Sequence, residues 1–322
     1  MEERYDDLNE FYLDNSGDLV FTKTHREYAD NITEASFIIK YAQADTLTSY
    51  KIKLDKLLLD DIQVKVDNFN NRYVFTSLFY KQKRSNIEGL YFLVWDKATQ
   101  KNVLENQIEF SDELKHEARG EGNWKSAFND FFIRNIIIKK DGGFIIGSES
   151  YYTTSRYNNW NRWDYLNRSP FLSPSDYYYY NSGYYGSYWS RSLWNSNSNT
   201  QNVRHHAENI VIFSIDKNGK PEWNNVISKE QFDDESDNLI SYQLMNTGGQ
   251  LHFLFNVNEK RVLLLNDFSV DGEGKINRNP TLKNLDRGYE FIARYGKQVS
   301  AKQMLVPCFY RNYICFAKID FN

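Results

Sequence analysis

The chain has few of the residues that disulfide-rich, proline-rich and membrane-spanning proteins depend on. Its 322 residues include only 5 prolines, 3 methionines and 2 cysteines. Two cysteines cannot make a disulfide framework, and they lack the four-ligand spacing of a zinc site. No apolar run approaches the length of about 18 residues that crosses a bilayer. We therefore expect a chain that does not span a membrane and that holds no structural zinc.

Known signals for catalysis and targeting are also missing. We find no Gly-x-Ser-x-Gly, His-Glu-x-x-His, phosphate-binding loop or dinucleotide-binding glycine motif. A pair of carboxylates for glycoside hydrolysis remains open, because the separation of such a pair is spatial. The start of the sequence has neither the basic nor the apolar region of a signal peptide, so a mature or trimmed form stays open. These observations favour a non-enzyme without cofactors.

The charges of the chain are nearly balanced. Lysine and arginine number 39 against 43 aspartates and glutamates, which gives a formal net charge of −4. A basic surface is what attracts nucleic acid or an anionic membrane, and this balance supplies none overall. We expect no nucleic-acid partner.

What the sequence has in quantity is aromatic residues, at 16% of the chain, including 24 tyrosines and 22 phenylalanines. Aromatic and β-branched side chains favour strands. Residues 209–227 show the local pattern, with an apolar run, a polar turn around Asn218-Gly219, and a half-polar run. This pattern predicts a β-hairpin and an all-β chain.

The same strand pattern recurs along the sequence. We expect five antiparallel units with four strands in each complete copy, at residues 10–13, 19–24, 37–43 and 50–54; 62–66, 73–80, 90–95 and 103–110; 133–139, 144–152 and the hairpin 209–227; 240–245, 251–257, 262–270 and 276–282; and 289–294, 299–309 and 313–321. Polar residues 111–129 separate the second and third units and have room for a short helix.

The repeat predicts a β-propeller-like array within a single domain, residues 1–322. The first turns of the units lie roughly 50 to 70 residues apart once one insertion is set aside, slightly more than the spacing of propeller blades. Runs such as Ile136–Ile138 and Phe144–Ile146 are apolar at consecutive positions, which indicates strands covered on both faces, whereas 223–228 alternates with polar residues. The fifth unit lacks its fourth strand. Residues before Glu10 could complete it, but five units are few for a ring, so we expect a truncated N-terminus.

An insertion at residues 153–207 interrupts the third unit. It is rich in Tyr, Asn, Ser and Trp, a mixture that gives rigid contact area together with adaptable hydrogen bonds. One interpretation is a recognition loop, and the other is a low-complexity excursion folded over the edge of the blade without a ligand. For the first interpretation, the candidate binding residues are Tyr157, Trp160, Trp163, Tyr178, Tyr179, Tyr185, Trp189 and Trp194.

Three groups of residues have some resemblance to metal sites. His205 and His206 are adjacent, so on an extended chain they point to opposite sides, and we expect a solvated loop end. The segment 14–18 resembles the start of a calcium loop, but His25 stands where the twelfth-position acid belongs. The acidic segment 233–237 is expected to be a solvated charge run. We predict no metal site.

The two cysteines flank a short predicted turn at Arg311-Asn312. Cys308 and Cys315 then lie opposite each other, which makes a cross-strand disulfide geometrically possible. Two reduced, buried cysteines are the alternative, and the sequence leaves both open.

Several segments carry a family resemblance, namely residues 141–152, 223–231, 241–242, 251–256 and 315–321. Through them the C-terminal two thirds of the chain resembles a group of uncharacterised β-propeller-like repeat proteins exported by Gram-negative bacteria. The resemblance implies a propeller-like fold and a location in the periplasm or at the cell surface. It brings no catalytic residues.

Two hypotheses about function follow. The first is a non-enzymatic binding or scaffold module of the bacterial envelope or surface, which contacts a protein or glycan through the aromatic insertion and one propeller face. The alternative is a glycan-active enzyme with a carboxylate site on the central face of the propeller. A pair of carboxylates converging in a deep axial pocket would favour the enzyme.

Overall fold

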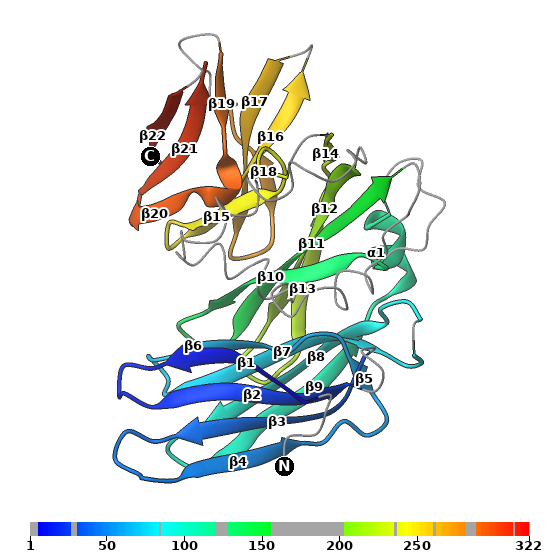
Figure 1. Ribbon diagram of the computed structural model, residues 1–322, viewed down its shortest axis with the longest axis vertical. Helices are drawn as coiled ribbons and strands as arrows, with labels where there is room; N and C mark the ends of the chain where they lie inside the picture. Colours follow the sequence, from blue (N-terminus) through cyan, green and yellow to red (C-terminus); the bar gives the residue numbers. More distant parts are fainter. Residues whose placement is uncertain are drawn as a thin grey trace, which may run out of the picture.

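The computed structural model describes residues 6–26, 31–83, 85–119, 128–155, 203–234, 237–259, 262–280, 288–311 and 313–321. Nearly all of the regular structure in these ranges is antiparallel β-sheet (Figure 1). The all-β prediction is confirmed.

The first two units share one nine-stranded sheet. One unit contains β1 (Asp6–Leu13), β2 (Leu19–Arg26), β3 (Ile32–Lys40) and β4 (Leu47–Ile52), and the next contains β6 (Gln63–Asp67), β7 (Arg72–Tyr80), β8 (Gly89–Asp96) and β9 (Lys101–Glu109). The short strand β5 (Leu58–Leu59) pairs with both β3 and β7 and so joins the two units. This bridging strand was not foreseen from the sequence.

A short helix, α1 (Asp112–Glu117), leads into the third unit. This unit contains β10 (Phe131–Ile138), β11 (Phe144–Ser155), β12 (Val203–Ile215) and β13 (Pro221–Ile227), with β14 (Gln231–Asp233) added beside β12. The fourth contains β15 (Tyr242–Asn246), β16 (Gln250–Glu259), β17 (Val262–Asp271) and β18 (Ile276–Arg278). The fifth contains β19 (Tyr289–Phe291), the 3-10 turn η4 (Ala293–Tyr295), β20 (Lys297–Ser300), β21 (Gln303–Tyr310) and β22 (Tyr313–Asp320).

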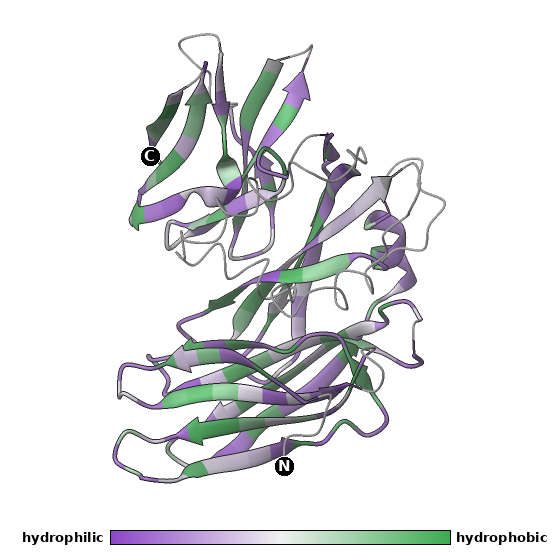
Figure 2. Ribbon diagram, in the orientation of Figure 1, coloured by the Kyte–Doolittle hydropathy of each residue, from purple (hydrophilic) through white to green (hydrophobic). Residues whose placement is uncertain are grey.

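The five units stack face to face with apolar layers between them. Residues of the first and second units share one buried cluster, and three more clusters join the second to the third, the third to the fourth and the fourth to the fifth. Hydrophobic residues lie along the strands, and many of the turns are hydrophilic (Figure 2). The middle strands β7 and β8 are buried almost throughout, whereas β9 is mostly exposed. The predicted contrast between covered strands and a wetter last strand is confirmed at Phe144–Ile146 and on β13, but Ile137 and Ile138 of the other predicted run are only partly buried.

The first strands of neighbouring units lie against one another, as the inner strands of a propeller do. Contacts join β1 to β6, β6 to β10, and β15 to η4. Side chains reinforce two of these neighbourhoods, since Glu10 Oε2 accepts a hydrogen bond from Val64 N at 3.1 Å and Gln298 Oε1 accepts one from Asn246 N at 3.1 Å. The first and last sheets lie at opposite ends of the long axis (Figure 1), so the described units form an open, propeller-like array.

One turn recurs in three of the units. At Asp14, Asp216 and Asp271 the aspartate carboxylate accepts hydrogen bonds from the backbone N–H groups two and four residues later. In each turn the residue three positions after the aspartate is a glycine with positive φ, between 78° and 87°. Glycine suits this position because it has no Cβ to clash in the left-handed region. The segment 14–18, which resembled a calcium loop in sequence, is one of these turns.

The recurring turn also joins neighbouring units. Gly219 lies against β9, where Leu104 packs beside it and Asn106 Nδ2 donates to the carbonyl oxygen of Gly219 at 3.0 Å. Gly274 lies in the same way against β13, where Trp223 packs beside it and Asn225 Nδ2 donates to its carbonyl oxygen. In both places, an apolar residue followed two positions later by an asparagine makes the contact between neighbouring units.

The structure differs from the sequence predictions in the fifth unit and beside the insertion. The expected first strand 289–294 ends at Phe291 and is followed by η4, and the expected strand 299–309 divides at the tight turn after Ser300 into β20 and β21. Both short strands β19 and β20 pair with β21, so together they replace one broken first strand. The strands β11 and β12 extend into the predicted insertion from both sides, because they pair with each other as far as Ser155 and Val203.

Candidate functional site on the inner strands

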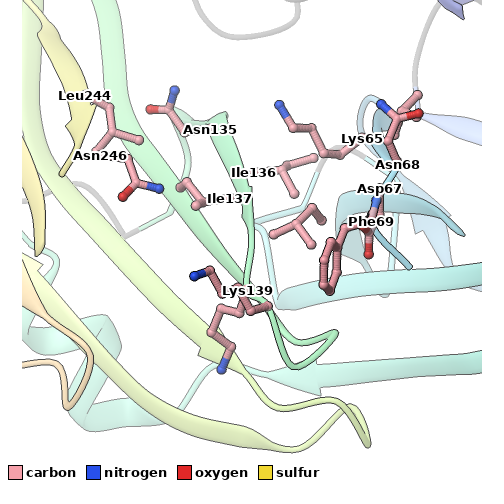
Figure 3. Close-up of a pocket in the computed structure, with 13 residues that line it drawn as sticks. Lys65, Asp67, Asn68, Phe69, Asn135, Ile136, Ile137, Lys139, Leu244 and Asn246 are labelled. Carbon is pink, nitrogen blue, oxygen red and sulfur yellow. Dashed lines mark hydrogen bonds between the residues drawn. The ribbon is translucent and has the colours of Figure 1, made fainter. Parts of the chain in front are cut away.

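A pocket with a volume of about 560 Å³ lies across the first strands of the second, third and fourth units. Its wall comes from β6 and the turn after it, from β10 and the turn after it, and from β15. Lys65, Asn68 and Phe69 lie on one side of β10, while Leu244 and Asn246 lie on the other (Figure 3). The isoleucines Ile136 and Ile137 of β10 line the space between the two sides.

Alternation along β10 explains this position. Successive side chains of a strand point to opposite faces. Ile136 belongs to the cluster between the second and third units, and Ile137 packs on the cluster between the third and fourth units. Within the described sheet β10 pairs with β11 on one side only, so its other edge borders the pocket.

Three asparagine side chains in the pocket wall have their oxygen atoms engaged by the protein. Asn68 Oδ1 accepts from Asn15 N at 2.9 Å, Asn135 Oδ1 accepts from the hydroxyl of Tyr242 at 2.8 Å, and Asn246 Oδ1 accepts from Gly248 N at 2.8 Å. Each amide is therefore fixed in orientation, and its NH₂ group has no acceptor among the described residues. Such groups can donate to a ligand.

Three lysines add positive charge to the same wall. Lys139 is engaged with Glu222 at 2.5 Å and with Ser214 Oγ at 3.3 Å. Lys65 and Lys140 reach solvent, and neither has an ion-pair partner in the described part of the chain. Loss of hydration in the hollow lowers the pKa of Lys65, because the protein around an ammonium group disfavours its charged form.

The carboxylate of Asp67 is the one acidic side chain among the described pocket residues, and its own turn occupies it. Its Oδ1 accepts from Phe69 N and Asn70 N, at 3.1 and 3.0 Å, and its Oδ2 accepts from Asn70 Nδ2 at 2.8 Å. These bonds hold the turn so that the ring of Phe69 stands 78% exposed at the pocket. The wall thus combines hydrogen-bond donors and cations with an exposed aromatic ring.

A second concentration of charge is buried between the third and fourth units. Glu149 on β11 forms ion pairs with Arg134 and, at 2.8 Å, with Lys229, and all three side chains are at most 4% exposed. Lys229 Nζ also donates to Ala207 O at 2.8 Å and to Gln231 Oε1 at 2.7 Å. Burial raises the pKa of Glu149, but the attraction of Lys229 and Arg134 outweighs it, so the pKa lies below its ordinary value. This group is closed to solvent, and the hydroxyl of Ser241, just before β15, donates to Glu149 Oε2 and so links the group to the fourth unit.

The eight aromatic residues predicted for binding all lie outside the described residues, so the structure does not test them. The same is true of most of the predicted insertion. Within the described ranges no group of three or more His, Cys, Asp or Glu side chains is placed to hold a metal ion. The described part of the chain also contains no helix that is long and apolar enough to cross a membrane.

The adjacent histidines are placed differently from the prediction. They lie inside strand β12 and not at a solvated loop end. His205 Nδ1 is 2.8 Å from the hydroxyl of Tyr151, while His206 stacks on Tyr152 with ring centres 4.5 Å apart. The prediction that the two rings would point apart fits these separate partners.

The acidic segment beside them is also more engaged than expected. Asp234 forms two hydrogen bonds with the guanidinium of Arg204, at 2.6 and 2.9 Å, and Asp237 pairs with the buried Arg294 at 2.8 Å. The expectation of a solvated charge run is wrong at Asp237, whose carboxylate pairs with a buried arginine, whereas Asp234 remains 53% exposed beside Arg204.

Sequence reasoning missed the lysines and asparagines of the pocket. They lie in three distant segments, residues 65–68, 135–140 and 246, so no local motif marks the site. Glu149 did carry a signal, because it interrupts the apolar strand 144–152, and a charge in a buried strand requires a partner. The identity of the partners, Arg134 on β10 and Lys229 after β13, depends on how the strands of the third unit are placed beside one another.

Comparisons with known proteins add a likeness in shape. No family model and no curated protein matches the sequence. An acylaminoacyl peptidase structure in complex with Z-Gly-Gly-Phe-chloromethyl ketone is similar at 9% identity and a TM-score of 0.45, over 99% of this chain and 39% of that one. The acylaminoacyl peptidase of Pyrococcus horikoshii is similar at 9% identity and a TM-score of 0.43, over 98% of this chain and 38% of that one. A family 117 glycoside hydrolase from Zobellia galactanivorans is similar at 10% identity and a TM-score of 0.34, over 98% of this chain and 84% of that one. This chain thus spans about two fifths of the length of the peptidases, and likeness at this level says nothing about its chemistry.

Proposed function

We propose that the chain is a non-enzymatic binding module whose inner-strand pocket takes an acidic glycan, a saccharide that bears carboxylate or sulfate groups. The observation that carries the proposal is that the available polar groups of the pocket wall are hydrogen-bond donors and cations. Its available polar groups are the ammonium groups of Lys65 and Lys140 and the amide NH₂ groups of Asn68, Asn135 and Asn246. A ligand rich in acceptors and negative charge complements such a wall.

A glycan also fits the remaining features of the wall. Sugar rings present hydroxyl oxygens to amide donors and an apolar face to aromatic rings, and Phe69 offers such a ring at the pocket. The volume of about 560 Å³ falls within the range of small-molecule sites, about 300 to 1,000 Å³. A periplasmic or surface location, as the sequence resemblance implies, would bring the pocket into contact with acidic envelope glycans.

The alternative is a glycan-active enzyme at the same face. Glycoside hydrolysis uses two carboxyl groups, separated by about 5 to 9.5 Å, that flank the scissile bond. The described pocket wall supplies Asp67 alone, and three hydrogen bonds of its own turn already occupy its oxygens. Binding without cleavage is therefore the function that this geometry supports better.

Equilibrium binding tests the proposal. The full chain should bind polygalacturonate or dextran sulfate and should not bind neutral dextran, as measured by calorimetry or affinity electrophoresis. The double variant K65Q/K140Q should lose about tenfold in affinity, which corresponds to about 1.4 kcal/mol. The matched control K53Q changes an exposed lysine that is not part of the pocket wall and should bind as the native chain does.

Two outcomes would overturn the proposal. Equal binding of the acidic polymers by the native chain and K65Q/K140Q would show that the pocket is not their site. Release of new reducing ends from a bound saccharide, lost when Asp67 is replaced by asparagine, would establish the enzyme instead.

A further inference from the structure

Cys308 and Cys315 are the two cysteines of the chain, and they face each other across the last hairpin. They are directly opposite in the register of β21 and β22, and their Sγ atoms are 2.7 Å apart. Both are free thiols in the structure. The sequence left open a cross-strand disulfide and two reduced, buried cysteines; in the structure Cys308 is buried, Cys315 is partly exposed, and the two side chains face each other.

The register of the two strands places these thiols within reach of a disulfide. Residues directly opposite in an antiparallel pair have Cα atoms about 4.5 to 5.5 Å apart. Disulfides span Cα separations of about 4.4 to 6.8 Å. The two strands run in register on both sides of the pair, with Val306 opposite Ala317 and Phe309 opposite Ile314.

The two thiols differ in their access to solvent. Cys308 is 2% exposed, whereas Cys315 is partly exposed. Burial, together with the neighbouring Cys315, raises the pKa of the Cys308 thiol to about 12. A reagent from solvent therefore meets Cys315 first, and Cys308 is the resolving thiol behind it.

The strand that carries Cys315 depends on this hairpin. In the described sheet β22 pairs with β21 alone, so it forms an edge. Its outward side chains include Ile314 at 56% and Phe316 at 66% exposure. An exposed apolar edge strand is prone to pairing with other chains unless it is held in place. A covalent link to β21 would hold it.

We propose that Cys308 and Cys315 form a dithiol site that small-molecule disulfides convert reversibly to a cross-strand disulfide. The Cys315 thiolate attacks one sulfur of a disulfide RSSR and releases one thiolate RS⁻, which leaves a mixed disulfide on Cys315. The Cys308 thiolate then attacks the Cys315 sulfur and releases the second RS⁻. The two protons lost by the cysteines leave on the two RSH products, so the cysteines are oxidised and RSSR is reduced.

Intact-mass analysis of the folded full chain in oxidised glutathione tests the chemistry. The native chain should lose two hydrogens, carry no glutathione and resist alkylation afterwards, and dithiothreitol should restore both thiols. The variant C308S should instead accumulate a glutathione adduct on Cys315, because the resolving thiol is gone. The variant C315S should react much more slowly, because its remaining thiol is buried.

Hydrogen exchange tests the consequence for the edge strand. Oxidation should slow exchange of the β22 amides in the native chain by severalfold and should leave β16 unchanged, and C308S should show no such slowing. The proposal is overturned if the folded native chain keeps two alkylatable thiols in oxidised glutathione, or accumulates a stable mixed disulfide, or forms disulfide-linked dimers. It is independent of the pocket, so failure of glycan binding leaves it standing.

Discussion

The hydroxyl of Tyr242 on β15 donates a hydrogen bond to Asn135 Oδ1 on β10, across 2.8 Å. The bond joins the inner strands of the third and fourth units and orients the amide that faces the pocket. Tyr242 is 1% exposed, and its ring lies 4.9 Å from the guanidinium of Arg134. One side chain thus connects the buried ion cluster, the contact between the units and the candidate binding site.

The variant Y242F should destabilise the protein by about 1 kcal/mol, the net value of a typical buried hydrogen bond. It should also weaken binding of the acidic saccharide, because the Asn135 amide loses its fixed orientation. Urea unfolding and calorimetry measure the two effects. Y313F is the matched control, since Tyr313 is 73% exposed and should tolerate the change. An unchanged unfolding midpoint in Y242F would contradict this role of the hydroxyl.

The turn around Gly219 predicts a difference between two glycine substitutions. Gly219 and Gly248 both have positive φ, 78° and 89°. A Cβ at Gly219 would lie 2.6 Å from Leu104 Cδ1, whereas a Cβ at Gly248 would have no atom within 4 Å. Both alanine variants are strained by about 1 kcal/mol. G219A should lose more, at the lower end of the ~1 to 3 kcal/mol that overpacking costs in a core, because Leu104 is only partly buried.

Denaturant unfolding of G219A and G248A measures this difference. The double variant G219A/L104A should recover part of the extra loss in G219A, because the smaller side chain makes room for the new methyl group. Equal stabilities for G219A and G248A would show that the turn does not press against β9 in solution.

Much of the fold follows from local sequence signals. Apolar runs such as Phe144–Ile146 mark buried strands, and turns with glycine, such as the one at Gly219, place the hairpins between them. These signals act over a few residues, so they can be read without knowledge of the tertiary structure. The fifth unit was harder, because η4 divides its first strand at residues without proline and with apolar neighbours. Gly296 follows η4 directly and is a turn signal in the sequence, but the start of the break depends on the packing around the buried Ala293 and Arg294.

The candidate site could not be predicted in the same way. Lys65, Asn135 and Asn246 lie in three separate units and meet only because the first strands of neighbouring units approach one another. The sequence instead directed attention to the aromatic insertion, whose composition is conspicuous. Composition identifies a segment suited to binding, but it does not say which side chains from distant segments converge.

The buried ion cluster predicts an acid-sensitive contribution to stability. The folded-state pKa of Glu149 is below its unfolded value. The stabilisation is therefore fully present above the unfolded pKa of about 4.3 and is lost as the pH falls through the folded-state pKa. At neutral pH the variant E149Q should lose about 3 to 5 kcal/mol, because Arg134 and Lys229 keep buried charges without their counterion.

Chemical denaturation of the native chain and E149Q at several pH values measures this contribution. The difference in unfolding free energy should be largest near neutral pH and should shrink below about pH 4, as Glu149 takes up a proton in the native chain. E290Q is the control, since Glu290 is an exposed glutamate on β19, and it should follow the native chain throughout. A constant difference between the native chain and E149Q across this range would contradict the assignment to Glu149.

The lowered pKa of Lys65 predicts how saccharide binding depends on pH. Loss of hydration in the pocket disfavours the ammonium form of Lys65 in the free protein. An anionic group of the ligand would favour the ammonium form, so the pKa of Lys65 should be higher in the complex than in the free protein. At a pH between these two pKa values, binding should be accompanied by uptake of a proton. Affinity is therefore full below the free-protein pKa and falls as the pH rises through it. The fall in affinity should begin below about pH 10.4, the ordinary lysine value.

Calorimetry in buffers of different ionisation enthalpy detects the proton uptake. The variant K65Q should bind the saccharide more weakly and show neither the uptake nor the early fall in affinity. If K65Q and the native chain show the same pH profile, Lys65 does not contact the bound anion.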